Sequence, residues 1–447
     1  MPPLDSATGQ SLTEGLWDLA SRPMAAADRA RAAQHLIDWL GCALAGASLP
    51  NGRAIVQGVE VGSNPFVAAG VAGATAMGGL GSLFEMDDVH RTALLHPGPV
   101  VIPAALAVVH QTGADPLACI LAGYETMVRL GSAVGPAHYA FFHNTGTCGG
   151  IGSAAAAALG LGLTDEQAVW AMGHAMSSAG GLWQCRNEPG ATKHLHVAEA
   201  ARRGVQAALW AKAGLAGPRH ILEGPQGFFA AVACDGVPGT VLACPETWRI
   251  HQVSFKPWPA CRHAHPAIDA ALSLRRDLRG RRVTAIRIHC FADALLFCDR
   301  PDPHTEDQAK FSLQHSVAVA LLCGAPKLTD FAPARIANPE LARLRRVTIV
   351  IADPDLTSRY PAHFGARLEV ETADNAVLSS QVADAWGDSE NPLTLEALLD
   401  KFQALTEHAG IARDQADALA AAALELVESP SPAPLLAALA CLRFPPG

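Results

Sequence analysis

The feature that most constrains the fold is a change in the spacing of hydrophobic residues along the chain. From the start to about residue 250, Ala, Leu and Gly recur at the three- and four-residue spacing of helices, as in residues 32–40 and 200–209. The run Thr164-Asp165-Glu166-Gln167 is typical of a capping box and predicts a helix after it. Small side chains let helix axes approach closely. This part of the chain therefore predicts a tightly packed helical bundle.

The hydrophobic period changes after about residue 282. Residues 283–290 alternate with period two and contain β-branched side chains, which predicts a strand. Two more strands are predicted at 347–352 and 368–372, and the turn residues Asp374-Asn375 indicate an antiparallel hairpin toward residues 376–378. A helix is predicted over 309–322, between the first two strands.

Helical spacing returns near the end of the chain. After Asn391-Pro392 it runs through 395–405 and 414–426, and the prolines of segment 429–432 break it before a last short helix. We therefore predict a mainly α fold with an α+β second domain. A discontinuous all-helical domain, residues 1–252 and 392–447, is interrupted by a smaller α+β lid domain, residues 253–391.

The composition excludes several classes of protein. The chain has 447 residues, half of them hydrophobic, so it can bury a large core. Its net charge of −9 makes nucleic acid or an anionic membrane an unfavourable partner. Its eleven cysteines include no CxxC pair, and the N-terminal segment has no secretory apolar region. Apolar runs such as 151–163 are shorter than the roughly 20 residues of a membrane span. We expect a cytoplasmic protein.

A proline-rich segment, Phe255–Pro266, concentrates groups that can bind an anion. It holds Lys256, Cys261, Arg262, His263 and His265 between three prolines. Proline fixes φ and lacks an N–H, so the segment predicts a stiffened loop. Its cations favour a small anionic ligand. The alternative is a solvated basic linker, which the Trp and Cys of the segment make less favourable.

An acidic segment is a second candidate. Residues 85–90 carry Glu85, Asp87, Asp88 and His90, and His96-Pro97-Gly98 follows just before a helix predicted near residue 101. Titratable groups crowded against an apolar helical wall have their pKa values pushed apart, which separates acid and base roles. The alternative is a helix C-terminus with an acidic surface loop.

Two further segments precede predicted helices. Residues 142–150 bring His143 and several Gly and Thr residues to the start of a helix over 152–160, where free N–H groups bind an oxyanion. A phosphate cradle is the rival, but neither GxxxxGK[ST] nor GxGxxG is present. Residues 192–196 place Lys193 and His196 three apart, on one face if helical, as a cation and a proton relay. The alternative is an ordinary surface lysine.

Metal binding is another interpretation of these histidines. Segments 261–265, 194–196 and 87–90 contain ligand types, but none has the HExxH or paired CxxC spacing typical of zinc sites. The neighbouring lysines also disfavour a divalent cation. We therefore predict no metal site from these residues.

The order of these motifs along the chain resembles the MmgE/PrpD family. The match runs from about residue 30 to 405. The motifs that carry it are 86–88, 96–98, 123–125 with Arg129, 142–149, 193–196, 222–224, 256–262 and 309–314. That family contains 2-methylcitrate dehydratase, cis-aconitate decarboxylase and iminodisuccinate epimerase. The resemblance implies a mainly helical domain with an α+β lid, a homodimer, a site in the cleft between the domains and no cofactor.

The resemblance also implies roles for individual residues. By position, His96, His143, Lys193 and Lys256 match the family's active-site residues, and the acidic segment contributes Glu85 or Asp87. Cys261 stands where some decarboxylases of the family have histidine. Tyr139 completes the predicted site as a candidate acid. The residues expected to bind substrate are Lys256, Cys261, Arg262, His265 and His196.

Two departures from the family motifs affect the choice of substrate. The family commonly has histidine where this chain has Ser82, and arginine where it has Glu199. The loss of a cation indicates a smaller or differently charged acid. The approach to His143 through residues 135–139 is more similar to the epimerase branch, which makes Tyr139 an acid candidate.

The reactions of the family share proton transfer at a carbon next to a carboxylate, which needs a base, an acid and charges that hold the enolate. We predict a lyase of the 2-methylcitrate dehydratase type acting on a small di- or tricarboxylate. The alternatives are an epimerase of an imino- or amino-dicarboxylate such as iminodisuccinate, a non-catalytic protein that binds small anions and, more distantly, a metal hydrolase.

Overall fold

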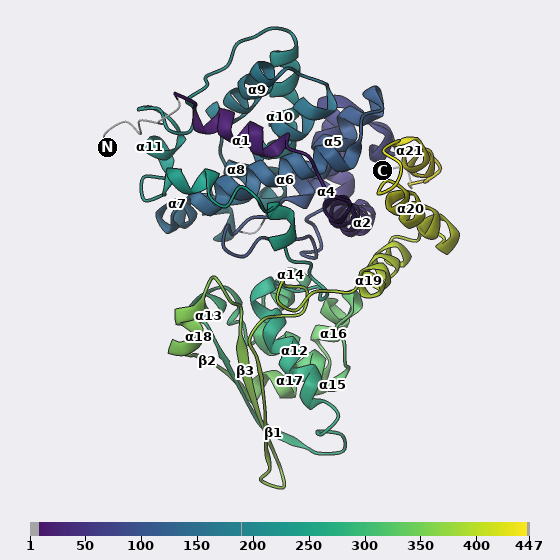
Figure 1. The fold of residues 1–447 in the computed structure, drawn as a ribbon. Coiled ribbons are helices and arrows are strands. Elements are labelled where there is room, and N and C mark those ends of the chain that lie inside the picture. The colour runs from purple at the N-terminus through teal and green to yellow at the C-terminus, as the bar shows by residue number, and fades with distance from the viewer. Residues whose placement is uncertain (1–8, 189, 445–447) are drawn as a thin grey trace. The chain divides into compact units, whose positions relative to one another are not determined.

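The computed structural model describes residues 9–188 and 190–444. The chain divides into two compact units, Met1–Val253 with Thr394–Gly447 (unit 1) and Ser254–Leu393 (unit 2). Unit 1 is helical and unit 2 combines helices with a sheet (Figure 1). The predicted fold class, mainly α with an α+β second part, is therefore confirmed.

α8 (Asn144–Gly160) is buried along nearly its whole length among helices of unit 1 that precede residue 254. Three further helices of unit 1 come from the end of the chain. The α-helices are α1 (Leu12–Ala20), α2 (Ala26–Ser48), α3 (Pro50–Val59), α4 (Gly70–Leu80), α5 (Gly98–Thr112), α6 (Pro116–Ala133), α7 (Pro136–Phe141), α8 (Asn144–Gly160), α9 (Asp165–Ser177), α10 (Thr192–Lys212), α11 (Phe228–Val232), α19 (Leu395–His408), α20 (Arg413–Glu425) and α21 (Ala433–Ala440). Short 3₁₀ segments are η1 (Pro65–Val67), η2 (Trp183–Arg186), η3 (Pro238–Leu242) and η4 (Arg249–Gln252).

Small residues explain how closely α8 packs. A Cβ on Gly152 would lie 2.8 Å from the carbonyl oxygen of Gly123 on α6, and one on Gly204 of α10 would lie 2.0 Å from Ser153 Oγ. Helices without side chains at the crossing points can bring their backbones together. The predicted capping box is confirmed, since Thr164 accepts from the N–H of Gln167 at the start of α9.

Unit 2 contains a four-stranded sheet in the order β2-β1-β3-β4. β1 is parallel to β2 and antiparallel to β3, and β3 forms the predicted hairpin with β4. Ile288 lies opposite Val350 on one side and Leu368 on the other. The strands and helices of the unit are β1 (Val283–Cys290), β2 (Thr348–Ala352), β3 (Ala366–Thr372), β4 (Val377–Val382), α12 (His265–Leu274), α13 (Ala292–Cys298), α14 (Glu306–Lys310), α15 (Leu313–Leu322), α16 (Pro333–Ile336), α17 (Pro339–Arg346), α18 (Pro354–Arg359), η5 (Arg262–Ala264) and η6 (Leu328–Phe331).

One face of the sheet is covered by helices, with α12 packed on β3 and β4 (Figure 1). Burial alternates along β3, as expected for a strand with one face on a core. The helix predicted over 309–322 is confirmed from Leu313 to Leu322, but it is not continuous back to residue 309. It is divided into α14 and α15, because Ser312 caps α15 by accepting from the N–H of His315 and donates its own hydroxyl to the carbonyl of Arg300.

Candidate functional site

The acidic segment 81–97 connects α4 to α5 and is buried. Glu85, Asp87, Asp88 and His90 are each less than one-tenth exposed. The alternative of an acidic surface loop is therefore wrong. Burying three carboxylates requires partners for each of them, and these partners separate their roles.

Asp88 stabilises the fold. Its Oδ2 lies 2.7 Å from His35 Nδ1 and accepts from the Tyr124 hydroxyl at 2.5 Å, while its Oδ1 accepts from the N–H of Gly98 at 2.8 Å. These bonds tie the segment to α2, α6 and the first turn of α5. A carboxylate held by three donors is suited to positioning its neighbours.

Asp87 is paired with His96. The Nδ1 atom of His96 lies 2.9 Å from Asp87 Oδ2 and 2.8 Å from the carbonyl oxygen of Asp88. Both of these oxygens can only accept from the ring, so Nδ1 carries the hydrogen and Nε2 is left with its lone pair. The His96 N–H donates to Thr145 Oγ1, which joins the segment to α8. This pair has the arrangement of an oriented general base.

The C-terminal part of unit 1 supports the acidic segment from behind. Lys401 on α19 donates to Asp38 of α2 and to the carbonyl of Met86, both at 2.6 Å. All three groups are buried. Burial raises the pKa of Asp38 to about 6, and the nearby ammonium of Lys401 opposes that rise. The ion pair therefore fixes the backbone directly before Asp87.

Glu85 forms an ion pair with Lys193 of α10. Its backbone has a φ of +58°, in the left-handed region that disfavours a side chain. The ion pair is partly open to solvent, with a quarter of the Lys193 side chain exposed. Next to it, Ser82 Oγ lies 2.8 Å from His194 Nδ1, so the serine at the family's histidine position contacts the same helix.

His143 is the buried residue immediately before α8. We predicted a helix only from 152, with free N–H groups before it. That prediction is wrong, because α8 begins at Asn144 and residues 145–150 are already helical. The His143 N–H donates to the carbonyl of Gly181 at 2.8 Å, whereas its Nδ1 is buried without a hydrogen-bond partner in the described part of the chain.

The surroundings of His143 are aromatic and cationic. Its ring lies 4.4 Å from the ring of Trp183 and 5.6 Å from that of His196. Burial lowers the pKa of His143 well below its ordinary value, and the positive charge of Lys193 lowers it further, as does that of a neighbouring histidine when it is protonated. Such a neutral imidazole among cations favours an anionic ligand.

Tyr139 and His196 lie at the edges of this cluster. The Tyr139 ring of α7 is edge-on to Trp183 at 5.9 Å, and the Arg186 guanidinium lies 4.4 Å from the centre of the Trp183 ring. His196 shares the start of α10 with Lys193, as the three-residue spacing predicted. Glu199 pairs with Arg202 on the same helix.

Unit 2 holds the predicted substrate-binding loop, and its cations are buried. Arg262 lies 2.5 Å from Asp388 and donates to the carbonyl of Trp386 at 3.0 Å. It also donates to His265 Nδ1, while His265 Nε2 donates to the carbonyl of Ala260. These bonds occupy both side chains and favour a structural role over direct contact with substrate. A solvated linker is excluded, since Lys256 too is only 1% exposed.

Cys261 lies in the same loop, with Sγ 3.2 Å from His263 Nδ1. A hydrogen bond from Cys298 holds the pKa of Cys261 well below its ordinary value. The segment 261–265 does not gather metal ligands, because His265 uses both ring nitrogens. Within the described chain, one histidine and two carboxylates do approach one another, namely His363, Asp384 and Glu390, and the sequence did not indicate them.

The structure thus brings together Glu85, Asp87, His96, His143, Lys193 and His196 in unit 1, with Tyr139 beside them. Trp183, Arg186 and His194 were missed. His194 stands inside a recognised motif, so its spacing to Lys193 was a usable signal. Trp183 and Arg186 lie in a short 3₁₀ segment with no motif, and only the contacts identify them.

Comparison with known proteins finds two family models that match the chain. The MmgE/PrpD N-terminal domain matches residues 11–238 and the C-terminal domain matches residues 258–426. Human cis-aconitate decarboxylase is 28% identical over 342 residues, which cover 72% of this chain and 69% of the relative. The Aspergillus terreus enzyme of the same name is 24% identical over 422 residues, covering 84% of each chain.

A dehydratase is also similar. The probable 2-methylcitrate dehydratase of Saccharomyces cerevisiae is 28% identical over 213 residues, or 45% of this chain and 41% of the relative. These relatives are lyases by name, which is the enzyme class that we predicted. The two domain matches together span most of the sequence, and this chain belongs to the MmgE/PrpD family.

Proposed function

We propose that this protein is a lyase that acts on a small di- or tricarboxylate by proton transfer at the carbon next to a carboxylate. The observation that carries the proposal is the Asp87–His96 pair, whose hydrogen bonds leave His96 Nε2 as a proton acceptor. The names of the relatives, a cis-aconitate decarboxylase and a 2-methylcitrate dehydratase, support the same class of acid as substrate.

His96 Nε2 is the proposed base. Asp87 holds its ring in the productive tautomer and stabilises the imidazolium that forms when the proton is taken. The side chain of His96 is 18% exposed, so a ligand can reach it, whereas Asp87 is buried behind it. In a dehydration the electron pair expels hydroxide, which leaves as water after protonation. In a decarboxylation CO₂ leaves and the carbanion is reprotonated.

Lys193 is the proposed carboxylate holder. A substrate carboxylate competes with Glu85 for its ammonium, and the enolate that develops has more charge for it to stabilise. The carboxylate of Glu85 is then released as a second proton acceptor. Lys256 stays a predicted carboxylate ligand.

His143 supplies the second proton-transfer group. Bound carboxylates offset the positive charges that lower its pKa, so substrate binding raises the proton affinity of the ring. The His143 ring is therefore neutral when no substrate is bound, and it accepts a proton more readily when substrate is bound. General acid–base help contributes about 10²–10⁴ in rate and one oxyanion donor about 3–4 kcal/mol, so the groups must act together.

The test is to assay the purified protein with cis-aconitate, 2-methylcitrate and other C4–C7 acids. Loss of water is followed by ultraviolet absorbance of the new double bond, and loss of CO₂ by a coupled assay. We expect turnover of one of these acids, and its loss in His143→Ala and Lys193→Ala with thermal melting unchanged. Full activity in both variants would contradict the proposed roles.

Epimerisation is the second candidate. It is favoured by the edge-on contact of Tyr139 with Trp183, whose ring also lies against that of His143, because an epimerase needs acid–base groups on both faces of one carbon. Solvent deuterium entering the substrate Cα without loss of water or CO₂ would distinguish it from a lyase. Tight binding of the acids without proton exchange would identify a non-catalytic binding protein instead.

The homodimer implied by the resemblance and the cytoplasmic location expected from the composition remain predictions, which light scattering and cell fractionation can test. The helices described by the structure include none with the length and hydropathy of a membrane span.

A further inference from the structure

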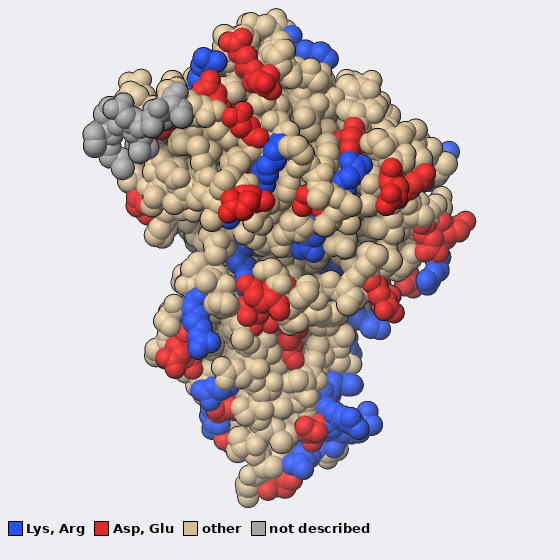
Figure 2. All heavy atoms as spheres, in the orientation of Figure 1, with Lys and Arg blue, Asp and Glu red and all other residues tan. Residues whose placement is uncertain are grey.

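Unit 2 contains a cavity of about 1000 Å³ that shares no residue with the proposed catalytic site. Six of its lining residues are arginines, and the only carboxylate among the lining residues is Glu340. The arginines are Arg275, Arg276, Arg279, Arg281, Arg282 and Arg343. Figure 2 shows Lys and Arg side chains gathered at the end of unit 2 where the loop between α12 and β1 lies. In a chain with a net charge of −9, this is a strong local concentration of positive charge.

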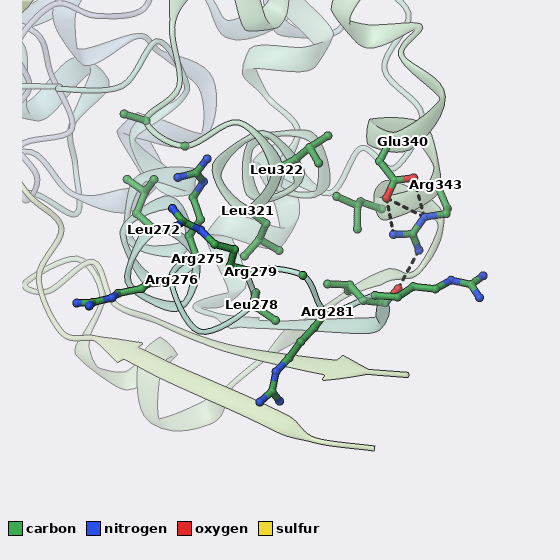
Figure 3. A pocket seen from close by; sticks show the side chains of 16 residues that line it. Leu272, Arg275, Arg276, Leu278, Arg279, Arg281, Leu321, Leu322, Glu340 and Arg343 are labelled. Atoms are coloured by element: carbon green, nitrogen blue, oxygen red, sulfur yellow. Dashed lines mark hydrogen bonds and ion pairs between the residues drawn. The ribbon is translucent and has the colours of Figure 1, made fainter. Parts of the chain in front are cut away.

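The loop between α12 and β1 holds most of these arginines in place. Leu278 is buried in the core of the unit and anchors the loop. The loop then reverses at Gly280, whose φ of +79° is accessible to glycine, and the N–H of Arg281 donates to the carbonyl of Leu278 at 3.0 Å. The exposed arginines therefore stand on a defined turn beside the cavity (Figure 3).

Contacts within the protein account for only some of the arginines. Arg343 is held by Glu340 at 2.7 Å and by the carbonyl of Val283 at 2.8 Å. Arg275 contacts the carbonyl of Cys323 at the end of α15, and Arg281 lies 3.5 Å from Asp374. These contacts do not involve the other three arginines, Arg276, Arg279 and Arg282.

The side chains of Arg276, Arg279 and Arg282 form no hydrogen bond or ion pair in the parts of the chain that the structure describes, although the charge of Arg282 helps to lower the pKa of Glu340. Like charges on one turn repel, and Glu340 and Asp374 offset only part of this charge, so a bound anion would stabilise the cluster. A solvated basic turn is the ordinary explanation for exposed arginines. It does not explain why six arginines line one cavity.

The walls of the cavity between the arginines are apolar. Leu272, Leu278, Leu321, Leu322 and Leu344 line it, and Leu322 is 41% exposed although it is a large hydrophobic residue. In Figure 3 the leucines lie in the middle of the view, while Arg276 and Arg281 extend away from them. A site with an apolar wall and a charged rim suits a ligand with one apolar and one highly charged part.

We propose that this cavity binds an organic polyphosphate, with its phosphate groups on the arginines and its ring or apolar part on the leucines. Guanidinium groups match phosphate oxygens in two-pronged hydrogen bonds. A nucleoside triphosphate and coenzyme A share this chemistry. A free tricarboxylate does not, since it is small for the cavity and offers nothing to the leucines.

The test is isothermal titration calorimetry of the full chain with ATP, coenzyme A, tripolyphosphate and citrate. We expect ATP or coenzyme A to bind, and whichever binds more tightly identifies the source of the phosphate. The double variant Arg279→Gln/Arg282→Gln should weaken that binding about tenfold or more, through the loss of two charge-assisted contacts. Arg359→Gln, which removes an exposed arginine elsewhere in unit 2, is the matched control and should bind like the wild type.

A second variant tests the apolar part of the site. Leu322→Asn should weaken binding of the organic polyphosphate and leave that of tripolyphosphate unchanged. The proposal is overturned if citrate or tripolyphosphate binds as tightly as the organic ligands, if neither organic ligand binds, or if the double variant matches the Arg359→Gln control. Circular dichroism melting of each variant separates loss of binding from loss of folding.

Discussion

The imidazole of His96 donates its Nδ1 hydrogen to the carboxylate of Asp87 at 2.9 Å, and the same atom lies 2.8 Å from the carbonyl of Asp88. Asp87→Asn keeps the size of the side chain but can present an N–H to the ring, which favours the wrong tautomer. We expect kcat to fall by about 10²–10⁴ with little change in KM.

The control for this prediction is a second Asp–His pair in the chain. His363 Nδ1 lies 2.8 Å from Asp384 Oδ1 in unit 2, and neither residue has a proposed catalytic role. Asp384→Asn should leave kcat at the wild-type value. Equal losses in both variants would mean that the Asp87 effect is not catalytic.

Two glutamates with the same backbone conformation separate function from strain. Glu85 and Glu60 both have a φ of +58°, but Glu60 is exposed at the end of α3, whereas Glu85 is buried and pairs with Lys193. Glu60→Gly should stabilise the protein by up to about 1 kcal/mol and leave activity unchanged. Glu85→Gly should relieve the same strain and lose activity. Urea unfolding and steady-state kinetics measure the two effects, and an active Glu85→Gly would exclude Glu85 from the site.

The buried Lys401–Asp38 pair is expected to control stability and the acidic segment together. Lys401→Met leaves Asp38 as an unpaired buried carboxylate and removes the donor to Met86, so we expect a loss of about 3–5 kcal/mol in the free energy of unfolding. The double variant Asp38→Asn/Lys401→Met removes both charges and should regain much of that stability. Its activity should remain low, because the carbonyl of Met86 still lacks its donor. Additive losses in urea unfolding would show that the pair is not coupled.

Stability is expected to fall in mild acid because buried histidines are neutral. Burial lowers the pKa of His35 and of His90 to about 4, against about 6.5 in an unfolded chain. A depressed pKa means that the unfolded state binds protons first, so the stabilisation is complete above pH 6.5 and is lost as pH falls toward 4. Each histidine accounts for at most about 3 kcal/mol.

The measurement for the pH prediction is the free energy of unfolding between pH 7 and 4. His35→Asn keeps a donor to Asp88 and removes one titrating group, so its slope in this range should be shallower than that of the wild type. An unchanged slope would mean that His35 has the same pKa in the folded and unfolded protein.

Local patterns in the sequence were sufficient for the elements and the family. Helical spacing before residue 250 and the alternation in 283–290 predict elements that the structure contains, because the period of hydrophobic residues reflects which face of a helix or strand is buried. The motifs around His96, His143 and Lys193 identified the family, and the two domain matches confirm it. Where a local pattern failed, as at Ser312, a side chain capped a helix that hydrophobic spacing alone would have continued.

The partners of the charged side chains required the tertiary structure. Nothing in the sequence distinguishes the role of Asp87 from that of Asp88. In the structure Asp87 orients His96, whereas the carboxylate of Asp88 is hydrogen-bonded to His35, Tyr124 and Gly98. Likewise, only the fold brings Lys401 to Asp38, 363 positions away, and engages Arg262 with Asp388. Sequence determines the local backbone because neighbouring residues determine it, but a buried charge is assigned its role by whichever group the folded chain places within hydrogen-bond distance.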